Sequence, residues 1–366
     1  MGRSFQDSQT ATTMSRHTRS LALFTLSLAT LACGRGDSDR PAGSSGVALT
    51  GAGATFPYPL YSRWFSDYAT EKGVRINYQS IGSGGGIRQI SEGTVDFGAS
   101  DGPMSDEELS RARGGRILHF PTVAGAVVVT YNLPGVSQVL NLDGPTVANI
   151  FLGNIRRWNA PEISALNPGV SLPDQDVIVV HRSDGSGTTY VFTDYLTAVS
   201  PAWASGPGRG KEVSWPVGLG GKGNEGVAGQ VKQTPGAVGY VELAYANQNR
   251  LPAAAIRNSS GNFIQPTLES ITAAISAAAE TLPADTDYRI SIVNPPGADA
   301  YPISSLTWLL VYEQQRDSTK ARQLADFLRW AFTEGEERAA ALDYAPLPES
   351  MRQLLLQRRD SLKLGS

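Results

Sequence analysis

Short turns rich in glycine, serine and threonine are the segments of this sequence best suited to chemistry. They lie at residues 51–55, 82–86, around Asp101 and at 184–188. If each turn joins a strand to a helix, it presents unpaired backbone N–H groups where the helix dipole adds positive potential. Such turns can bind anions, and Arg182 beside the last one adds a cation. Taken singly, each is more typical of a tight connection, but several such turns with hydroxyls and Arg182 together favour an anion site.

The elements around these turns alternate between strand and helix. Apolar or β-branched runs predict strands at residues 47–50, 74–79, 95–99, 123–131, 177–180, 237–241, 290–293 and 306–312. Between them, Leu60, Tyr61, Trp64, Phe65 and Tyr68 fall on one helical face, and further helices are expected from Ile87, from Ser105, at 318–332 and at 349–359. The alternation predicts an α/β fold with mainly parallel sheets.

Composition narrows the class of protein. The chain has 366 residues, of which 41% are hydrophobic and 18% charged, so it can bury a large core, and its length suggests two domains. A net charge of −3 argues against a nucleic-acid partner, which needs a clustered basic face. One cysteine and three histidines make a structural disulfide impossible and a metal cluster improbable on composition.

The first 33 residues are typical of an export signal. Arg16 and Arg19 precede an uncharged run at residues 21–32, which is too short to span a bilayer as a stable helix. The run ends at Cys33 in a sequence that resembles a bacterial lipobox, so lipid attachment at Cys33 is expected; an ordinary cleaved signal is the alternative. Met14 is a plausible start. Residues 34–46 are polar and rich in Gly, Ser and Pro, which predicts a flexible tether.

Two enzymatic interpretations deserve comparison. The spacing of Gly218, Gly220 and Gly223 matches a dinucleotide motif, but no clear strand precedes it, so we interpret it as a chance match. Residues 98–102 read G-x-S-x-G after a strand. In an exported serine hydrolase, Ser100 would then be the nucleophile, with His181 or His119 as base and an aspartate such as Asp143 to orient it.

Five ordered motifs carry a family resemblance that extends over residues 47–357. They are GAGATFP at 51–57, IGSGGG at 81–86, VDFGASD at 95–101, DGSGT at 184–188 and WPVGLGGKGN at 215–224. Together they resemble the periplasmic phosphate-binding proteins of high-affinity phosphate ABC transporters. The match departs from the family pattern at His181, where a second Arg is common, and at Gly84, where a second Ser is common.

The resemblance implies a two-lobed clamshell in which each lobe is a mixed, mainly parallel sheet flanked by helices, and crossing strands form the hinge. Lobe one would comprise residues 47–124 and 297–357, lobe two residues 125–296, and residues 358–366 a C-terminal tail. The implied phosphate ligands are Thr55, Phe56, Ser83 and Asp101 from lobe one and Arg182, Ser186, Gly187 and Thr188 from lobe two, with Asp184 orienting Arg182.

The chemistry of these residues agrees with the implied ligand. Phosphate near neutral pH keeps at least one O–H, and an ionised Asp101 can accept its hydrogen bond. Sulfate has no proton to offer and would leave a buried charge unpaired. Asp101 is therefore the expected filter against sulfate, unless it merely caps the next helix. Arg182 offers a planar fork that matches phosphate oxygens.

The sequence therefore predicts an extracytoplasmic, lipid-anchored, monomeric binding protein without catalytic activity, cofactor or metal. Its partners would be phosphate and the permease and ATPase subunits of an ABC importer. The alternatives are a binder of another tetrahedral oxyanion such as arsenate, a serine hydrolase or phosphatase that uses Ser100, and an adhesin or signalling module that lacks the ligand.

Overall fold

The computed structural model describes residues 48–279 and 287–363. The predicted signal at 1–33, Cys33 and the predicted tether at 34–46 lie outside these residues, as do residues 280–286 of the expected second lobe.

Eight strands form the main sheet, in the order β2-β1-β3-β11-β4-β8-β6-β7. The outer strands pair in parallel with their neighbours, whereas the pairs β3–β11, β11–β4 and β4–β8 in the centre are antiparallel. The mixed α/β fold that the sequence predicted is confirmed. The strands are β1 (Leu49–Gly53), β2 (Ile76–Ser80), β3 (Phe97–Ser100), β4 (Ile117–Tyr131), β6 (Ile178–Arg182), β7 (Leu219–Gly221), β8 (Ala237–Glu242) and β11 (Ser304–Tyr312).

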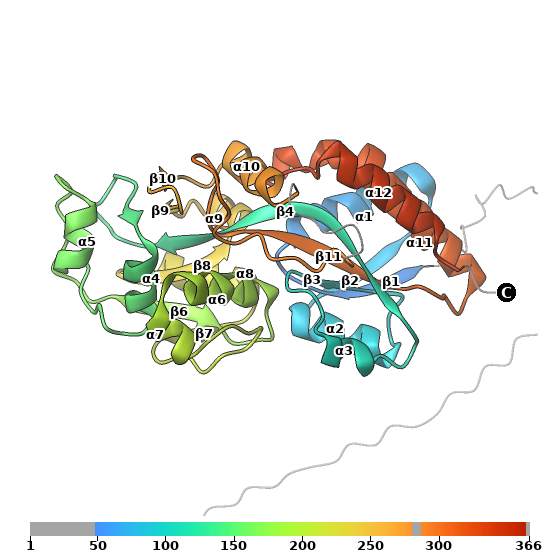
Figure 1. Cartoon of the computed structure of the whole chain (residues 1–366), viewed down its shortest axis with the longest axis horizontal. Coiled ribbons are helices and arrows are strands. Elements are labelled where there is room, and N and C mark those ends of the chain that lie inside the picture. The colour runs from blue at the N-terminus through green and yellow to red at the C-terminus, as the bar shows by residue number, and fades with distance from the viewer. Residues whose placement is uncertain (1–47, 280–286, 364–366) are drawn as a thin grey trace, which may run out of the picture. The chain divides into compact units, whose positions relative to one another are not determined.

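The long strand β4 belongs to both ends of this sheet. Its residues from Ile117 to Ala126 pair with β11, and those from Val127 to Tyr131 pair with β8. All of its residues are buried. We call β1–β3 with helices α1–α3 the first half, and β6–β8 with helices α6–α9 the second half. Strands β4 and β11 run between the two (Figure 1).

Helices cover both faces of the strands in the first half. Helices α1 (Tyr58–Lys72), α11 (Ser318–Trp330) and α12 (Glu349–Asp360) lie on one face, and α2 (Ser83–Glu92) and α3 (Asp106–Ser110) on the other (Figure 1). Short π and 3₁₀ turns at Ala331–Gly335, Glu336–Arg338 and Ala340–Leu342 join α11 to the segment before α12. Helix α12 continues to Asp360, past the expected start of a tail at residue 358.

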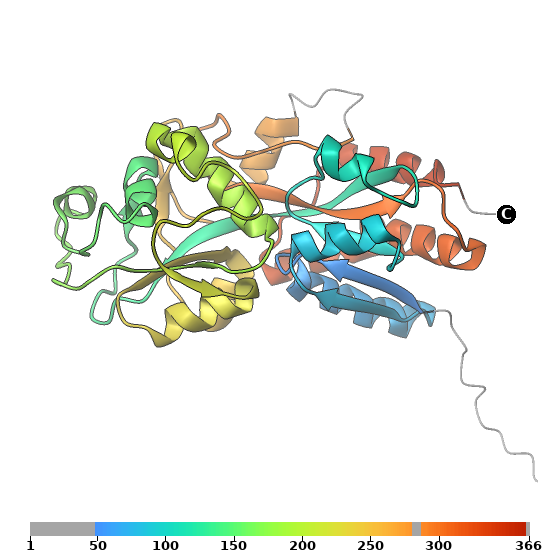
Figure 2. The ribbon, with the colours of Figure 1, turned by 90° about the horizontal axis from the view of Figure 1, so that it is seen from below.

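Figure 2 shows the second half on the other side of the central strands, and several further short elements accompany it or pack on the central strands. A separate sheet of three strands has the order β10-β9-β5. The remaining elements are α4 (Gly144–Phe151), α5 (Pro161–Leu166), α6 (Gly187–Val199), α7 (Pro201–Ser205), α8 (Gly223–Gln233), α9 (Leu243–Asn249), α10 (Leu268–Ala279), β5 (Asn141–Leu142), β9 (Ala255–Arg257) and β10 (Phe263–Ile264).

Helix α1 illustrates how the sequence specifies these elements. The five residues that the sequence placed on one helical face, Leu60, Tyr61, Trp64, Phe65 and Tyr68, are the buried ones. Gly73 ends the helix with φ 72°, a left-handed conformation that glycine adopts without steric cost. The predicted amphipathic helix is therefore confirmed.

One predicted strand is wrong. Residues 290–293 form no strand, although Ile292 is buried. Tyr288 and Asn294, on either side, have positive φ values of 53° and 48°, which interrupt an extended ladder. The segment is held by side chains instead, because the Ser291 hydroxyl donates to Asp194 over 2.6 Å and the Arg289 guanidinium donates to Asp106 over 2.7 Å.

Candidate functional site

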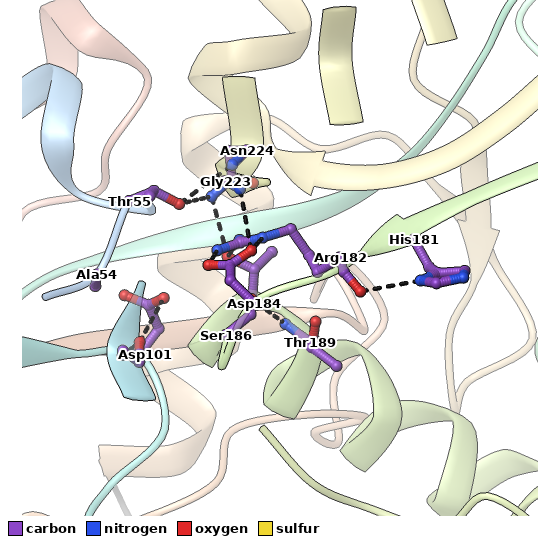
Figure 3. Close-up of polar contacts among 12 residues, drawn as sticks. Ala54, Thr55, Asp101, His181, Arg182, Asp184, Ser186, Thr189, Gly223 and Asn224 are labelled. Atoms are coloured by element: carbon purple, nitrogen blue, oxygen red, sulfur yellow. Dashed lines mark hydrogen bonds and ion pairs between the residues drawn. The ribbon is translucent and has the colours of Figure 1, made fainter. Parts of the chain in front are cut away.

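Three helices begin beside one another at the carboxyl ends of parallel strands, where ligands bind in open α/β sheets. Thr55 and Phe56 precede α1, Ser83 opens α2, and Ser186 caps α6, whose first residues are Gly187 and Thr188. The Ser186 hydroxyl accepts from the amide of Thr189 over 3.0 Å, which fixes the first turn of α6 (Figure 3). The sequence-predicted turns are thus brought to one place.

Unpaired amides make this place suitable for an anion. Among the residues that the structure describes, the backbone N–H groups of Thr55, Phe56, Ser83, Gly187 and Thr188 find no acceptor. Helix starts of this kind supply both N–H donors and positive dipole potential. All of these residues are buried, so an anion bound there would be screened from water.

Glycine is required where the turns meet. A Cβ on Gly187 would lie 2.4 Å from the Ser83 hydroxyl and 2.6 Å from a carboxylate oxygen of Asp101. Gly187 therefore brings the start of α6 against the first half of the sheet. The amide of Gly84 donates to the carbonyl of Gly185 over 2.8 Å, which also joins the two halves.

Arg182, at the end of β6, is held by Asp184. The Arg182 side chain is only 1% exposed, and its Nε and Nη2 atoms donate to the two Asp184 oxygens over 2.7 and 2.5 Å. The Gly223 amide adds a third hydrogen bond to Asp184 over 3.0 Å (Figure 3). Burial acts to raise the pKa of Asp184, but the bonds and charge of Arg182 lower it below its ordinary value.

Asp101 lies opposite this ion pair, and no cation from the described part of the chain is bonded to it. One carboxylate oxygen accepts from the Thr307 hydroxyl over 2.9 Å, and the other lies 3.4 Å from the Ser83 hydroxyl. Burial raises the pKa of Asp101 to about 7, against the hydrogen bond of Thr307 and the charge of Arg182. Asp101 does not cap the following helix, because Ser105 caps α3 with its hydroxyl in a capping box.

Several residues at this site were not predicted from the sequence. Asn224 contacts both Thr55 and Thr188, and Thr307 supports Asp101. The hydroxyls of Tyr245 and Tyr344 donate to the carbonyls of Thr55 and Phe56, each over 2.6 Å. The fifth motif, which ends at Asn224, was the available signal for the first of these residues; nothing local marked the others.

The residues of the hydrolase alternative are not assembled. The Ser100 hydroxyl donates to the carbonyl of Gly102, and His181 stacks on Trp215 and bonds to the carbonyl of Arg182. Asp143 caps α4 by accepting from Thr146. His119 accepts from the Met104 amide and pairs with Asp287 over 2.6 Å. None of these groups is bonded to Ser100 within the described residues.

The described residues contain no cluster of three or more His, Cys, Asp or Glu side chains that could hold a metal. The dinucleotide-like glycines end at Gly223, whose amide is bonded to Asp184. No helix within residues 48–279 and 287–363 has the length and apolarity to cross a membrane.

The fold and the arrangement of the site define a protein of the PBP superfamily, whose domain model matches residues 39–334. The phosphate-binding protein PstS of Xylella fastidiosa is 46% identical over 83% of this chain and 83% of its own length. That of Pasteurella multocida is 46% identical over 83% of this chain and 88% of its length. The chain belongs to the family of phosphate-binding proteins PstS.

A solved structure supports the fold independently. A high affinity periplasmic phosphate-binding protein, bound with phosphate at pH 8.5, aligns with a TM-score of 0.69 at 22% identity. The alignment covers 87% of this chain and 96% of that protein.

Proposed function

We propose that this chain binds inorganic phosphate, in its mono- and dibasic forms, between the two halves of the sheet. Its ligands would be Thr55, Phe56, Ser83, Asp101, Arg182, Ser186, Gly187 and Thr188, with Asp184 orienting Arg182. The observation that carries the proposal is the burial of a carboxylate without a bonded cation, Asp101, among helix-start amides and opposite Arg182.

The donor set explains why phosphate fits. The amides, hydroxyls and Arg182 offer hydrogen bonds to acceptor oxygens, and Asp101 takes one from a P–O–H group. Sulfate would place its charge against the Asp101 carboxylate without a proton between them, which costs several kcal/mol in a buried site. Arsenate, which is also protonated, would be rejected only by size.

Delivery to a membrane importer follows from the family. The relatives are named as phosphate-binding proteins, which supports an extracytoplasmic receptor that releases phosphate to the permease of an ABC transporter and catalyses nothing. We further propose lipid attachment at Cys33, outside the described residues, and two lobes with the boundaries 47–124 plus 297–357 and 125–296. A lipid label that Cys33→Ser abolishes would support the anchor.

Calorimetric titration of the purified protein, freed of bound anion, tests the binding function. Phosphate and sulfate are compared at pH 6 and pH 8. Tight 1:1 binding of phosphate is the expected result, with sulfate undetected at pH 8, where Asp101 is mostly ionised. Equal binding of both anions would contradict the role of Asp101, and no phosphate binding would overturn the proposed function.

A further inference from the structure

Asn224, the second residue of α8, makes four hydrogen bonds at the site and is fully buried. Its side-chain nitrogen donates to the Thr55 hydroxyl oxygen over 2.7 Å and to the Thr188 hydroxyl oxygen over 3.1 Å. Its backbone amide donates to the same Thr55 oxygen over 3.2 Å. Its side-chain oxygen accepts from the amide of Glu242 over 2.9 Å (Figure 3 shows Asn224 beside Thr55).

The orientation of the Asn224 amide is fixed by Glu242. A backbone N–H can only donate, so the Asn224 atom that faces the Glu242 amide must be the oxygen. The nitrogen must then face the two threonines, and its two hydrogens match the two hydroxyl oxygens in number. Asn224 therefore acts toward both threonines as a donor.

The hydroxyl of Thr55 can act toward any further partner only as a donor. A hydroxyl has two acceptor lone pairs and one proton. Both contacts from Asn224 use lone pairs of the Thr55 oxygen, so its proton remains free to donate elsewhere.

The hydrogen bonds of Thr188 follow the same pattern. Its oxygen accepts from Asn224 and lies 3.4 Å from an Arg182 nitrogen, which is also only a donor. Thr188, like Thr55, therefore keeps its proton for another partner.

We infer that Asn224 is a positioning residue that sets the polarity of the Thr55 and Thr188 hydroxyls, so that both donate to the bound anion. The inference rests on the proposed phosphate function, but it concerns a residue that need not touch the ligand. Without the Asn224 side chain each hydroxyl has a lone pair that it could turn toward a phosphate oxygen, which repels it.

Two substitutions probe this polarity. Asn224→Ala removes the side-chain donor that Thr55 and Thr188 share, and leaves each hydroxyl with one weaker donor, the backbone amide of residue 224 for Thr55 and Arg182 for Thr188. Phosphate affinity should fall roughly 10-fold. Asn224→Asp keeps the shape but replaces the donor with an acceptor, which draws the threonine protons away from the anion. Together with the added charge, this should lower affinity by about 100-fold or more.

A double-mutant cycle separates polarity from packing. Asn224→Ala is measured alone and in a Thr55→Val background by titration with inorganic phosphate. The Thr55→Val protein has no Thr55 hydroxyl to orient. In that background Asn224→Ala should therefore lower phosphate affinity by only about 3-fold, through its effect on Thr188. The matched control is Asn258→Ala, since Asn258 is also buried and bonded but lies among the backbone carbonyls of residues 297–300. It should leave affinity unchanged.

The outcomes are distinct. An equal loss from Asn224→Ala in both backgrounds would overturn the inference while leaving phosphate binding intact. Wild-type protein that fails to bind phosphate would overturn the proposed function and the inference with it. Thermal unfolding of each variant without ligand confirms folding, and Asn224→Asp, which keeps the volume of the side chain, tests the same prediction if Asn224→Ala does not fold.

Discussion

The two halves of the site each contribute an aspartate, Asp101 buried and Asp184 partly exposed, and the two carboxyls behave in opposite ways. Asp184, in the second half, is bonded to Arg182 and to the Gly223 amide, and its pKa lies below the ordinary value. The carboxyl of Asp101, in the first half, is bonded only to hydroxyls among the described residues, and burial raises its pKa to about 7. The deeper burial of Asp101 and the cation beside Asp184 together decide the charge of each carboxyl.

The difference shows how work is divided between the halves. Asp184 is ionised, and its carboxylate holds the Arg182 guanidinium in place. Asp101 has hydroxyl partners but no cation among the described residues, so a protonated ligand could supply a further hydrogen bond. The same residue type thus provides rigidity in one half and selectivity in the other, and the variants below test this division.

The largest expected effect concerns folding without ligand. The Asp101 carboxyl holds its proton up to about pH 7 in the folded protein but only to about 3.8 when unfolded. Between these values the folded state binds more protons, so the free energy of unfolding falls as pH rises, by on the order of 4 kcal/mol in all. Asp101→Asn should remove this slope, as chemical denaturation from pH 4 to pH 8 would measure.

Glu336 provides the matched control for that measurement. It is buried outside the site, and burial raises its pKa to about 8. Glu336→Gln should also raise stability at high pH but leave phosphate affinity unchanged. A pH slope that survives Asp101→Asn in full would show that Asp101 is already ionised in the folded protein.

The next effect concerns the ion pair. Asp184→Asn weakens two charge-assisted hydrogen bonds that orient Arg182, so phosphate affinity should fall by about 2 kcal/mol, or roughly 30-fold. Calorimetric titration at pH 7 measures the loss. Selectivity against sulfate should persist, because Asp101 is unchanged; a variant that binds both anions alike would break the proposed division of roles.

The smallest effect concerns the support of Asp101. Thr307→Val removes the hydroxyl that donates to Asp101 over 2.9 Å, which costs about 1 kcal/mol of phosphate affinity, or roughly 5-fold. The loss should be smaller in an Asp101→Asn background, where no charge is left to support. Equal losses in both backgrounds would indicate that Thr307 acts through packing.

Local sequence patterns predicted the anion site because its donors are local features. A glycine-rich turn before a helix exposes amides wherever it occurs, and the turns at 51–55, 82–86 and 184–188 meet as expected. The roles of the individual residues in binding phosphate remain predictions, as do the signal and Cys33 outside the described residues.

The supporting residues could not be found this way because they are remote in sequence. Asn224 lies 169 residues from Thr55, and Thr307 lies 206 residues from Asp101. Their contacts depend on how the sheet is assembled. For Thr307, the decisive pairing is that of β11, late in the sequence, with β3, early in the sequence. The strand predicted at 290–293 is wrong for a similar reason. The apolar Ile292 is buried there, but the segment is not paired in a sheet.

Strand β4 changes partner between Ala126 and Val127, where the ladder with β11 gives way to the ladder with β8. One continuous strand contributes to both ladders. If β4 unfolds on one side, the strands on the other side lose a hydrogen-bonding partner as well. Heat should therefore melt the described chain as one cooperative unit, with equal calorimetric and van't Hoff enthalpies. The shared strand makes a protein with two halves behave, in thermodynamic terms, as one.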